Sequence, residues 1–304
     1  MKQTKINNLK KNKSENLKFF AFTSPWIVGF LLLIIIPLLG SFYISFTEWK
    51  ILDKPVFVGL DNYREIFQDP LIYKSLKVTF IFTLINVPVS MIITFFIALL
   101  LNTNFRYNSL FRTIYYLPSV VSGTATAMLW VWLFNHKFGV INRALFRIGI
   151  EGPAWLSDES WALYTLILMS LWGAGSGIML YLSGFKLVNN DFHEIAILSG
   201  ASFWDRLKNI TIPAMSPVLL FAFLTGVING LQSFTSSFIT TGGGPNNATM
   251  FYALYLYNNA FKFRKMGKAC AMAWLLFVVI FVMSILILKV SKKMVYYGNN
   301  GDSE

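Results

Sequence analysis

Six runs of mostly apolar residues divide this sequence, and none of them contains Asp, Glu, Lys or Arg. They cover residues 26–46, 78–101, 114–134, 161–182, 217–239 and 270–288. A run of about 20 apolar residues is long enough to cross the hydrocarbon of a bilayer as a helix. Because backbone groups in lipid must be hydrogen-bonded internally, we predict an all-α membrane protein with six transmembrane helices. We expect kinks at Pro37, Pro88 and Pro118.

The composition agrees with membrane burial and argues against several soluble functions. Only 13% of the residues are charged, whereas a soluble domain averages about 25%. The net charge of +12 arises from cations at the ends of the apolar runs, without a basic helix or aromatic platform, so nucleic-acid binding is not expected. The single cysteine, Cys270, and two distant histidines, His136 and His193, predict neither a disulfide framework nor a metal site.

The first 19 residues carry six lysines and one glutamate, which predicts a cytoplasmic tail. The run that follows lacks a small-residue cleavage site and is expected to be an uncleaved anchor. With six spans, both termini are then cytoplasmic. We divide the chain into a tail, 1–19, a membrane region, 20–290 (core 75–290), and a second tail, 291–304. Four cations count against this orientation unless a re-entrant or surface segment holds them: Lys262, Arg264, Lys265 and Lys268.

Two absences limit how such a chain moves a solute uphill. Ion-coupled transporters keep an ionisable residue in the membrane, and these six runs have none. The phosphate-binding pattern GxxxxGK[ST] is also missing. The energy for uphill transport is therefore expected to come from a partner chain.

A compact polar stretch, EIAILSGASFWDRLKNITIP at residues 194–213, separates the fourth and fifth runs. Residues 191–194 and 202–205 have the spacing of capping boxes, Gly200 suits a left-handed turn, and Pro213 is expected to end the second helix. An apolar stripe recurs at Phe203, Leu207 and Ile210. The pattern predicts a helical hairpin, which either lies in the membrane interface or docks a soluble partner.

The order of residues in this stretch resembles the EAA loop of permease subunits in binding-protein-dependent ABC importers. The shared positions are Glu194, Ala196, Gly200, Ala201, Ile210 and Pro213, and Ile195 departs from the family's alanine. Residues 111–118, and residues 241–249 with Tyr257 and Phe261, are similar to segments of the sugar-type permeases.

This resemblance implies a transmembrane subunit of a carbohydrate ABC importer, with the MetI-like permease fold, in a bacterial cell membrane. It implies that the residues of the loop form coupling helices for the ATPase. The expected partners are a second homologous permease, two ATP-binding subunits that hold ATP and Mg²⁺, an extracytoplasmic sugar-binding protein and membrane lipid. No catalytic residue, metal or cofactor is expected in this chain.

Neutral polar residues in the fifth run are candidates for the sugar path. Asn229, Gln232, Ser233 and Ser236 have the spacing of one helical face. Such a face meets either a wet cavity or another helix, because polar side chains also hold membrane helices together. Weaker candidates are Asn86, Ser90, Ser122 and Thr126. Three tryptophans either stack on a sugar or, more simply, pack and anchor the helices: Trp130, Trp132 and Trp172.

Beyond the fifth run, Gly242, Gly243, Gly244 and Pro245 predict a flexible outer turn. It either faces the binding protein or is an ordinary loop. Asp158 and Glu159 are adjacent and so lack the opposed geometry of paired catalytic acids. Three rival functions remain: a permease for another solute such as glycerol phosphate, an integral membrane enzyme, and a secondary transporter.

Overall fold

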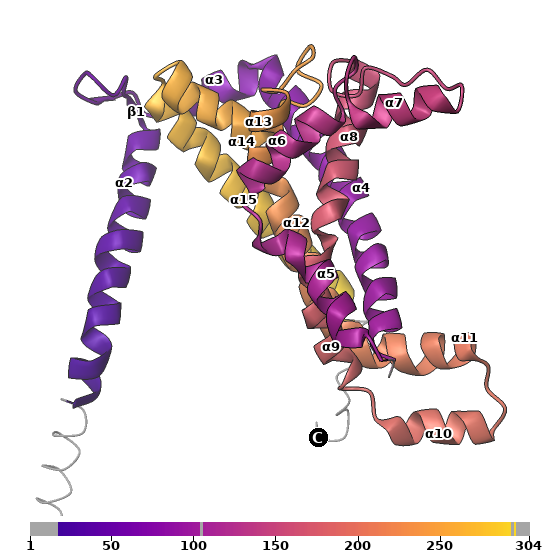
Figure 1. Cartoon of the computed structure of the whole chain (residues 1–304). Helices are drawn as coiled ribbons and strands as arrows, with labels where there is room; N and C mark the ends of the chain where they lie inside the picture. Colours follow the sequence, from indigo (N-terminus) through magenta and orange to yellow (C-terminus); the bar gives the residue numbers. More distant parts are fainter. Residues whose placement is uncertain (1–17, 104–105, 293–294, 296–304) are drawn as a thin grey trace, which may run out of the picture. The chain divides into compact units, whose positions relative to one another are not determined.

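The computed structural model describes residues 18–103, 106–292 and 295, and their regular structure is almost entirely helical (Figure 1). The only strands in these residues, β1 (Thr47–Glu48) and β2 (Val56–Phe57), form an antiparallel pair. The chain divides into two compact units. The first comprises Met1–Ile66 and Asn259–Leu275, and the second comprises Phe67–Asn258 and Leu276–Glu304.

The elements follow one another in a simple order. In the first unit they are η1 (Leu31–Ile35), α2 (Ile36–Ser45), β1, β2 and most of α3 (Asp61–Gln68). The second unit contains α4 (Pro70–Leu101), α5 (Asn108–Val120), α6 (Gly123–Leu133), α7 (Val140–Arg147), α8 (Glu159–Leu171), η2 (Trp172–Gly177), α9 (Ile178–Phe185), α10 (Asn190–Leu198), α11 (Phe203–Arg206), η3 (Leu207–Thr211), α12 (Ile212–Leu231), α13 (Thr235–Thr240) and α14 (Tyr252–Tyr257). The chain ends with η4 (Asn258–Lys262) and α15 (Met266–Ser291).

Every predicted span corresponds to helix long and apolar enough to cross a membrane. Five described helices meet this description by themselves: Lys18–Ser45, Pro70–Leu101, Glu159–Phe185, Phe203–Thr240 and Met266–Ser291. The sixth is a pair, α5 and α6, bent by 95°. Residues 1–17 of the predicted tail, 1–19, and most of the tail 291–304 lie outside the described residues, whereas Lys18 and Phe19 belong to the first long helix. That division of the chain stays a prediction.

The third predicted span is broken, not merely kinked. Helix α5 contains Pro118 and ends at Val120, and the next two residues, Val121 and Ser122, have extended backbone angles (ψ of 137° and 131°). Proline removes one hydrogen bond of the preceding turn, and two extended residues after it complete the break. The span predicted over 114–134 is thus made of two helices, where the sequence predicts one helix kinked at Pro118.

The prediction that Pro213 ends a helix is also wrong. The chain passes from α11 through the π-helical turn η3 into α12, and Pro213 lies in the first turn of α12. The N–H of Ile212 donates to the carbonyl of Leu207, five residues earlier, so the widened turn accommodates the proline ring. Pro37 likewise follows the π-helical turn η1. Helix α4, by contrast, continues through Pro88 without such a turn.

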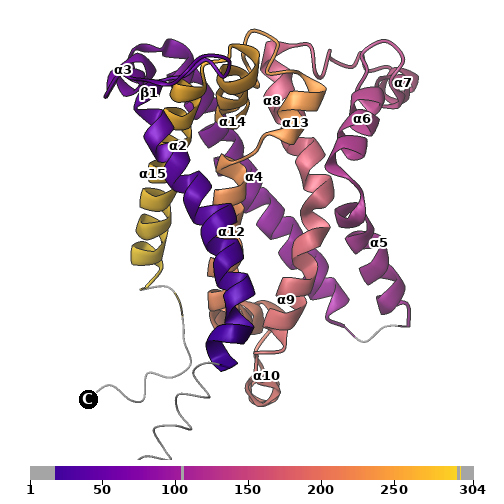
Figure 2. The same cartoon turned by 90° about the vertical axis from the view of Figure 1, so that its left-hand side faces the viewer.

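Helix α4 is central to the second unit, where it packs against α8, α9 and α12. Small residues on α12 set the closest approach. A Cβ on Gly226 would lie 3.0 Å from a methyl group of Val87, and one on Gly230 would lie 2.8 Å from the side chain of Thr83. The hairpin of α10 and α11 lies at one end of these helices, and α7, α13 and α14 lie at the other (Figures 1 and 2).

A polar cluster holds the first unit together. Asn62 Nδ2 donates to the carbonyls of Ser45 (2.8 Å) and Thr47 (2.9 Å). Glu65 accepts from Lys265 Nζ at 2.9 Å and from Lys268 Nζ at 3.1 Å, and the side chain of Lys268 is only 5% exposed. Two of the four cations that count against the predicted orientation thus contact a carboxylate.

Glu65 makes this cluster sensitive to pH. Burial raises the pKa of Glu65, but hydrogen bonds from Lys265 and Lys268 outweigh it and hold the pKa below its usual value. A carboxylate with a lowered pKa stabilises the fold above its unfolded-state pKa, about 4.3, and loses that contribution as the pH falls through the folded-state value.

Replacing Glu65 with Gln should therefore lower the thermal midpoint at pH 7, and the difference from wild type should shrink below about pH 4. Because Glu65 is about half exposed, we expect a loss of about 1 kcal/mol or less. Unfolding curves in detergent measure both effects. Glu48→Gln, which removes the more exposed pair with Lys50, is the control. An equal difference at pH 7 and pH 3.5 would contradict the assignment.

Candidate functional site

A cavity of about 350 Å³ lies among α4, the α8–α9 segment and the α12–α13 segment of the second unit. Hydroxyl and amide side chains alternate with apolar ones around it. Its polar lining comprises Asn86, Ser90, Thr94, Ser170, Ser176, Tyr181, Thr225, Asn229, Ser233 and Ser236. None of the described residues that line it carries a charge.

The structure brings together three of the four predicted path residues. Asn229, Ser233 and Ser236 line the cavity, whereas Gln232 does not. The predicted single helical face is wrong because α12 ends at Leu231 and Gln232 is its exposed C-terminal cap. Ser233 and Ser236 are then presented by the break and by α13.

The polar groups of the cavity differ in whether the chain already uses them. Ser170 Oγ donates to Asn86 Oδ1 at 2.5 Å, and Thr94 Oγ1 donates to the carbonyl of Ala174 at 2.9 Å. Asn229, by contrast, is exposed and has no side-chain hydrogen bond among the residues that the structure describes. Its amide is available to a solute, while Asn86 and Thr94 also hold α4 against the α8–α9 segment.

Sequence reasoning missed several of these side chains. Four of them are small hydroxyl residues inside apolar runs, where little in the sequence distinguishes them: Thr94, Ser170, Ser176 and Thr225. One signal was present: Asn86, Ser90 and Thr94 recur every four residues along α4. The weaker candidates Ser122 and Thr126 do not line the cavity. Nor do Trp130 and Trp172, whose rings pack edge to face at 5.9 Å.

The hairpin at 190–213 forms much as its sequence predicts. Gly200 has φ of +79°, and the N–H groups of Gly200 and Ala201 donate to the carbonyls of Ile197 (3.0 Å) and Ala196 (2.9 Å). This pattern is a Schellman motif. Ser202 and Asp205 form the predicted capping box. At the start of α10, however, the cap is Asn189, which accepts from the N–H of Asp191, so the predicted Asp191–Glu194 box is wrong.

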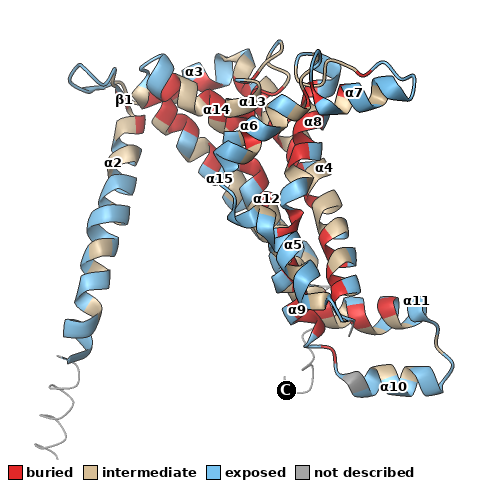
Figure 3. Cartoon of the chain, viewed as in Figure 1, coloured by how far each residue is buried: buried red, intermediate tan, exposed pale blue. Residues whose placement is uncertain are grey.

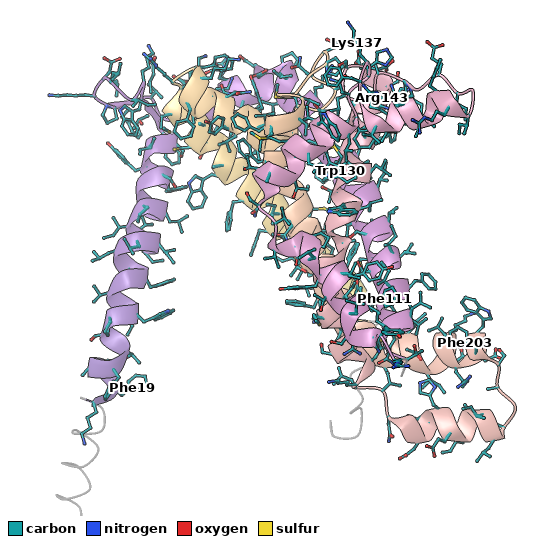
Figure 4. All side chains as sticks on the ribbon, viewed as in Figure 1. Phe19, Phe111, Trp130, Lys137, Arg143 and Phe203 are labelled. Atoms are coloured by element: carbon teal, nitrogen blue, oxygen red, sulfur yellow. The ribbon has the colours of Figure 1, made fainter. Side chains whose placement is uncertain are left out.

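One arm of the hairpin is attached to the helices and the other is exposed (Figure 3). Leu207 is buried and Ile210 packs against the same core as Met215. On α10, by contrast, no described side chain is buried, and Glu194 is exposed. The exposed fraction is 88% for Leu198 and 60% for Ile195. Phe203, the first residue of the predicted apolar stripe, is exposed as well (Figure 4).

The glycine turn beyond α13 is held by hydrogen bonds. Gly242 and Gly243 have φ of +59° and +92°. Thr249 Oγ1 contacts Thr241 Oγ1 at 2.6 Å, and the carbonyl of Thr249 accepts from Ser237 Oγ at 2.5 Å. These bonds close the turn, in contrast to the flexible segment that the glycines predict. Gly244 and Pro245 line a second cavity of about 390 Å³ together with Asn135 and His136.

The two adjacent acids have local partners. Asp158 caps α8 by accepting from the N–H of Ser160, and Glu159 accepts from Asn246 Nδ2 at 3.0 Å. Among the described residues, no three His, Cys, Asp or Glu side chains are grouped so that they would hold a metal ion.

Comparison with known proteins identifies the family. Residues 90–296 match the model of the binding-protein-dependent transport system inner membrane component. The chain belongs to this family. It is a multi-pass membrane protein and a permease subunit, so the prediction of a transport subunit in place of an enzyme is confirmed.

Individual relatives of this permease match most of its length. It is 37% identical to the probable ABC transporter permease protein YesP of Bacillus subtilis (strain 168), over 95% of this chain and 96% of the relative. It is 32% identical to the lactose transport system permease protein LacF of Rhizobium radiobacter, over 87% of this chain and 91% of the relative.

A solved structure supports the importer-type permease fold. One chain of a bacterial ABC transporter involved in the import of the acidic polysaccharide alginate superposes with a TM-score of 0.85 at 22% identity. The match covers 95% of this permease and 100% of that chain. The predicted all-α, importer-type permease fold is thereby confirmed, while the orientation of the termini stays a prediction.

Gly200→Ala should loosen the hairpin. The left-handed backbone costs an alanine about 1 kcal/mol, which corresponds to about fivefold faster hydrogen exchange at the Ala201 amide. Mass-spectrometric exchange of the purified permease measures it. Ser199→Ala, at a right-handed position in the same turn, is the control. Equal exchange in the two variants would mean that the Schellman motif does not hold this turn.

Proposed function

We propose that this permease forms half of the membrane path of an ATP-driven importer of uncharged sugars. The observation that carries the proposal is the central cavity, whose lining offers hydroxyl and amide groups without a charged side chain. Membership in the binding-protein-dependent family supports the transport role.

Chemistry favours a neutral, hydroxyl-rich solute in this cavity. A sugar that leaves water must replace its hydrogen bonds, and Asn229, Ser233, Ser236 and Asn86 supply donors and acceptors of both kinds. A phosphate or carboxylate would need a cation, and none lines the cavity. The name of the lactose relative supports the same class, and glycerol phosphate is the less favoured alternative.

The hairpin is proposed to couple the path to an ATPase subunit. Glu194 and Ala196 would be its contacts and Gly200 its turn. The whole coupling loop would comprise Glu194, Ile195, Ala196, Gly200, Ala201, Ile210 and Pro213. Exposed apolar residues on α10 provide a surface suited to a partner's groove. The attached arm continues through η3 into α12, so a displacement of the hairpin moves the helix that carries Asn229.

The remaining partners follow from this arrangement. A second, homologous permease would complete the path. Two ATP-binding subunits would hold ATP and Mg²⁺ beneath the hairpins. With six spans and a lysine-rich start, both termini would lie in the cytoplasm. An extracytoplasmic binding protein would deliver the sugar at the opposite end, where Gly242, Gly243, Gly244 and Pro245 form the closed turn.

The coupling role predicts different effects for two equally simple substitutions. Leu198→Ser should weaken co-purification of the ATP-binding subunit about tenfold, because burial of a leucine side chain contributes about 1.5–3 kcal/mol. Leu60→Ser changes a leucine that is 68% exposed elsewhere in the chain and should have no effect.

A charge reversal tests the same surface by activity. Glu194→Lys should reduce the sugar-stimulated ATPase of the complete transporter and leave its thermal midpoint unchanged, because Glu194 is exposed. If the purified chain carries no ATPase partner, or if the substitution changes neither assembly nor transport, the hairpin does not couple.

Two amide side chains near the end of α12, one inside the cavity and one outside it, test the proposed sugar path. Asn229→Leu removes an amide from the cavity and should lower uptake into proteoliposomes about tenfold, the value of one neutral hydrogen bond. Gln232→Leu removes an amide outside the cavity and should transport normally. Lactose and glycerol 3-phosphate serve as the two probes. Uptake of the phosphate ester but not of neutral sugars would overturn the proposed substrate class.

A further inference from the structure

A third cavity, of about 400 Å³, lies beside α7 at the end of the second unit opposite the hairpin. Figure 4 labels two of its residues, Lys137 and Arg143, at the end of this unit that is distant from Phe203. Its lining also includes Asn142, Phe146, Arg147 and Glu151. Neither the sugar path nor the coupling hairpin uses any of these residues.

The cavity carries an unbalanced positive charge. Three cations, Lys137, Arg143 and Arg147, line it against one carboxylate, Glu151, so the difference leaves two positive charges. Within the described residues, none of these four side chains takes part in an ion pair or a hydrogen bond. Arginine side chains in this state bind phosphate oxygens strongly, through several donors at once.

The wall behind these cations is fixed by buried hydrogen bonds. Asn142 is buried, and its Nδ2 donates to the carbonyls of His136 (3.0 Å) and Pro153 (3.2 Å). Its Oδ1 accepts from Trp155 Nε1 at 2.5 Å. A Cβ on Gly152 would overlap the Asn142 side chain. The loop segments on either side of α7 are therefore held close together, and the cavity is a built feature of the fold.

Large exposed apolar side chains lie close to the same cations in the sequence. Phe146 lies between Arg143 and Arg147 in sequence and is 78% exposed, and Ile148, just after the helix, is 69% exposed. Phe138, Val140 and Ile150 are exposed as well, and α7 is mostly pale blue in Figure 3. Cations flanked by exposed apolar residues on a short peripheral helix are typical of a segment that lies in a membrane interface.

We propose that this cavity binds the headgroup phosphate of an anionic phospholipid, with the apolar residues around α7 in contact with its acyl chains. The charge selects the anion, and the apolar rim selects a lipid over free phosphate. The proposal relies on the proposed function only for the side of the membrane, which is extracytoplasmic. A lipid at this place would hold α7, and through Asn142 the adjoining loops, at a defined depth.

The test is native mass spectrometry of the complete transporter, titrated with phosphatidylglycerol or phosphatidylcholine. Each cation near an anionic headgroup contributes about 1 kcal/mol, so Arg143→Gln with Arg147→Gln should weaken phosphatidylglycerol binding about thirtyfold. Phosphatidylcholine should bind no more tightly to the wild type than to the variant. Lys262→Gln with Arg264→Gln, which removes the same charge from another exposed segment, should bind as the wild type does.

Two further variants separate the alternatives. Phe146→Ser keeps the charge and should weaken the lipid but not inorganic phosphate. Lys137→Gln, on the loop before α7, should lower the affinity for phosphatidylglycerol about fivefold. It replaces the double variant if that variant does not fold.

Three results would overturn the proposal. The first is unchanged phosphatidylglycerol binding in the folded variants, and the second is displacement of the lipid by millimolar inorganic phosphate. The third is a lower affinity of the double arginine variant than of the wild type for the binding protein, measured in nanodiscs of neutral lipid. The last would assign the cavity to the binding protein. Sugar uptake in pure phosphatidylcholine vesicles tests the transport function separately.

Discussion

The close approach of α12 to α4 is the contact on which the rest of the second unit depends. Gly226 and Gly230 leave room only for Val87 and Thr83, so the two backbones lie nearer than larger side chains would allow. In lipid, where apolar burial does not draw helices together, such close packing supplies much of the attraction. The same contact aligns Asn229 on α12 with Asn86 and Ser90 on α4, and so determines where the cavity lies.

Continuity between the hairpin and α12 suits this packed helix to the mechanical role proposed for it. An ordinary loop would absorb a displacement by rotating a few backbone angles. A helix that continues through a π-turn does not have that freedom, because its hydrogen bonds run from α11 to Leu231. Leu207 and Ile210 further fix the attached arm to the core. The break at Gln232 then limits how far the displacement extends beyond the cavity.

The sequence predicts the broad architecture because the bilayer permits few backbone structures. Uncharged runs of the right length must be helices, and their number and approximate positions agree with the structure. Local chemistry also predicts Gly200 and the Ser202–Asp205 box, since their backbone requirements are intrinsic. The break at Val121 is predicted only as a kink at Pro118, since a proline in a helix does not by itself specify two extended residues after it. The break at Gln232 is not predicted, because glutamine is a good helix former. The prediction at Pro213 is wrong because a π-helical turn accommodates the proline ring, which usually ends a helix.

Contacts between distant residues were the least accessible to sequence reasoning. Glu65 and Lys265 are far apart in the chain, and nothing local relates them. Ser170 and Thr94 are inconspicuous in apolar runs, although one lies against Asn86 and the other against the α8–α9 segment. The three cations beside α7 seemed ordinary membrane-flanking residues until the fold placed them around one cavity.

The exposed arm of the hairpin has a consequence for the life of the protein before assembly. Leu198, Ile195 and Phe192 face water in the isolated chain, and water-exposed clusters of this kind are what chaperones and quality-control proteases recognise. A copy made in excess of its ATPase would display this signal, and an assembled copy would hide it. The surface proposed to contact the ATPase would thus also report whether the complex is complete, and would tie the abundance of the permease to that of its partner.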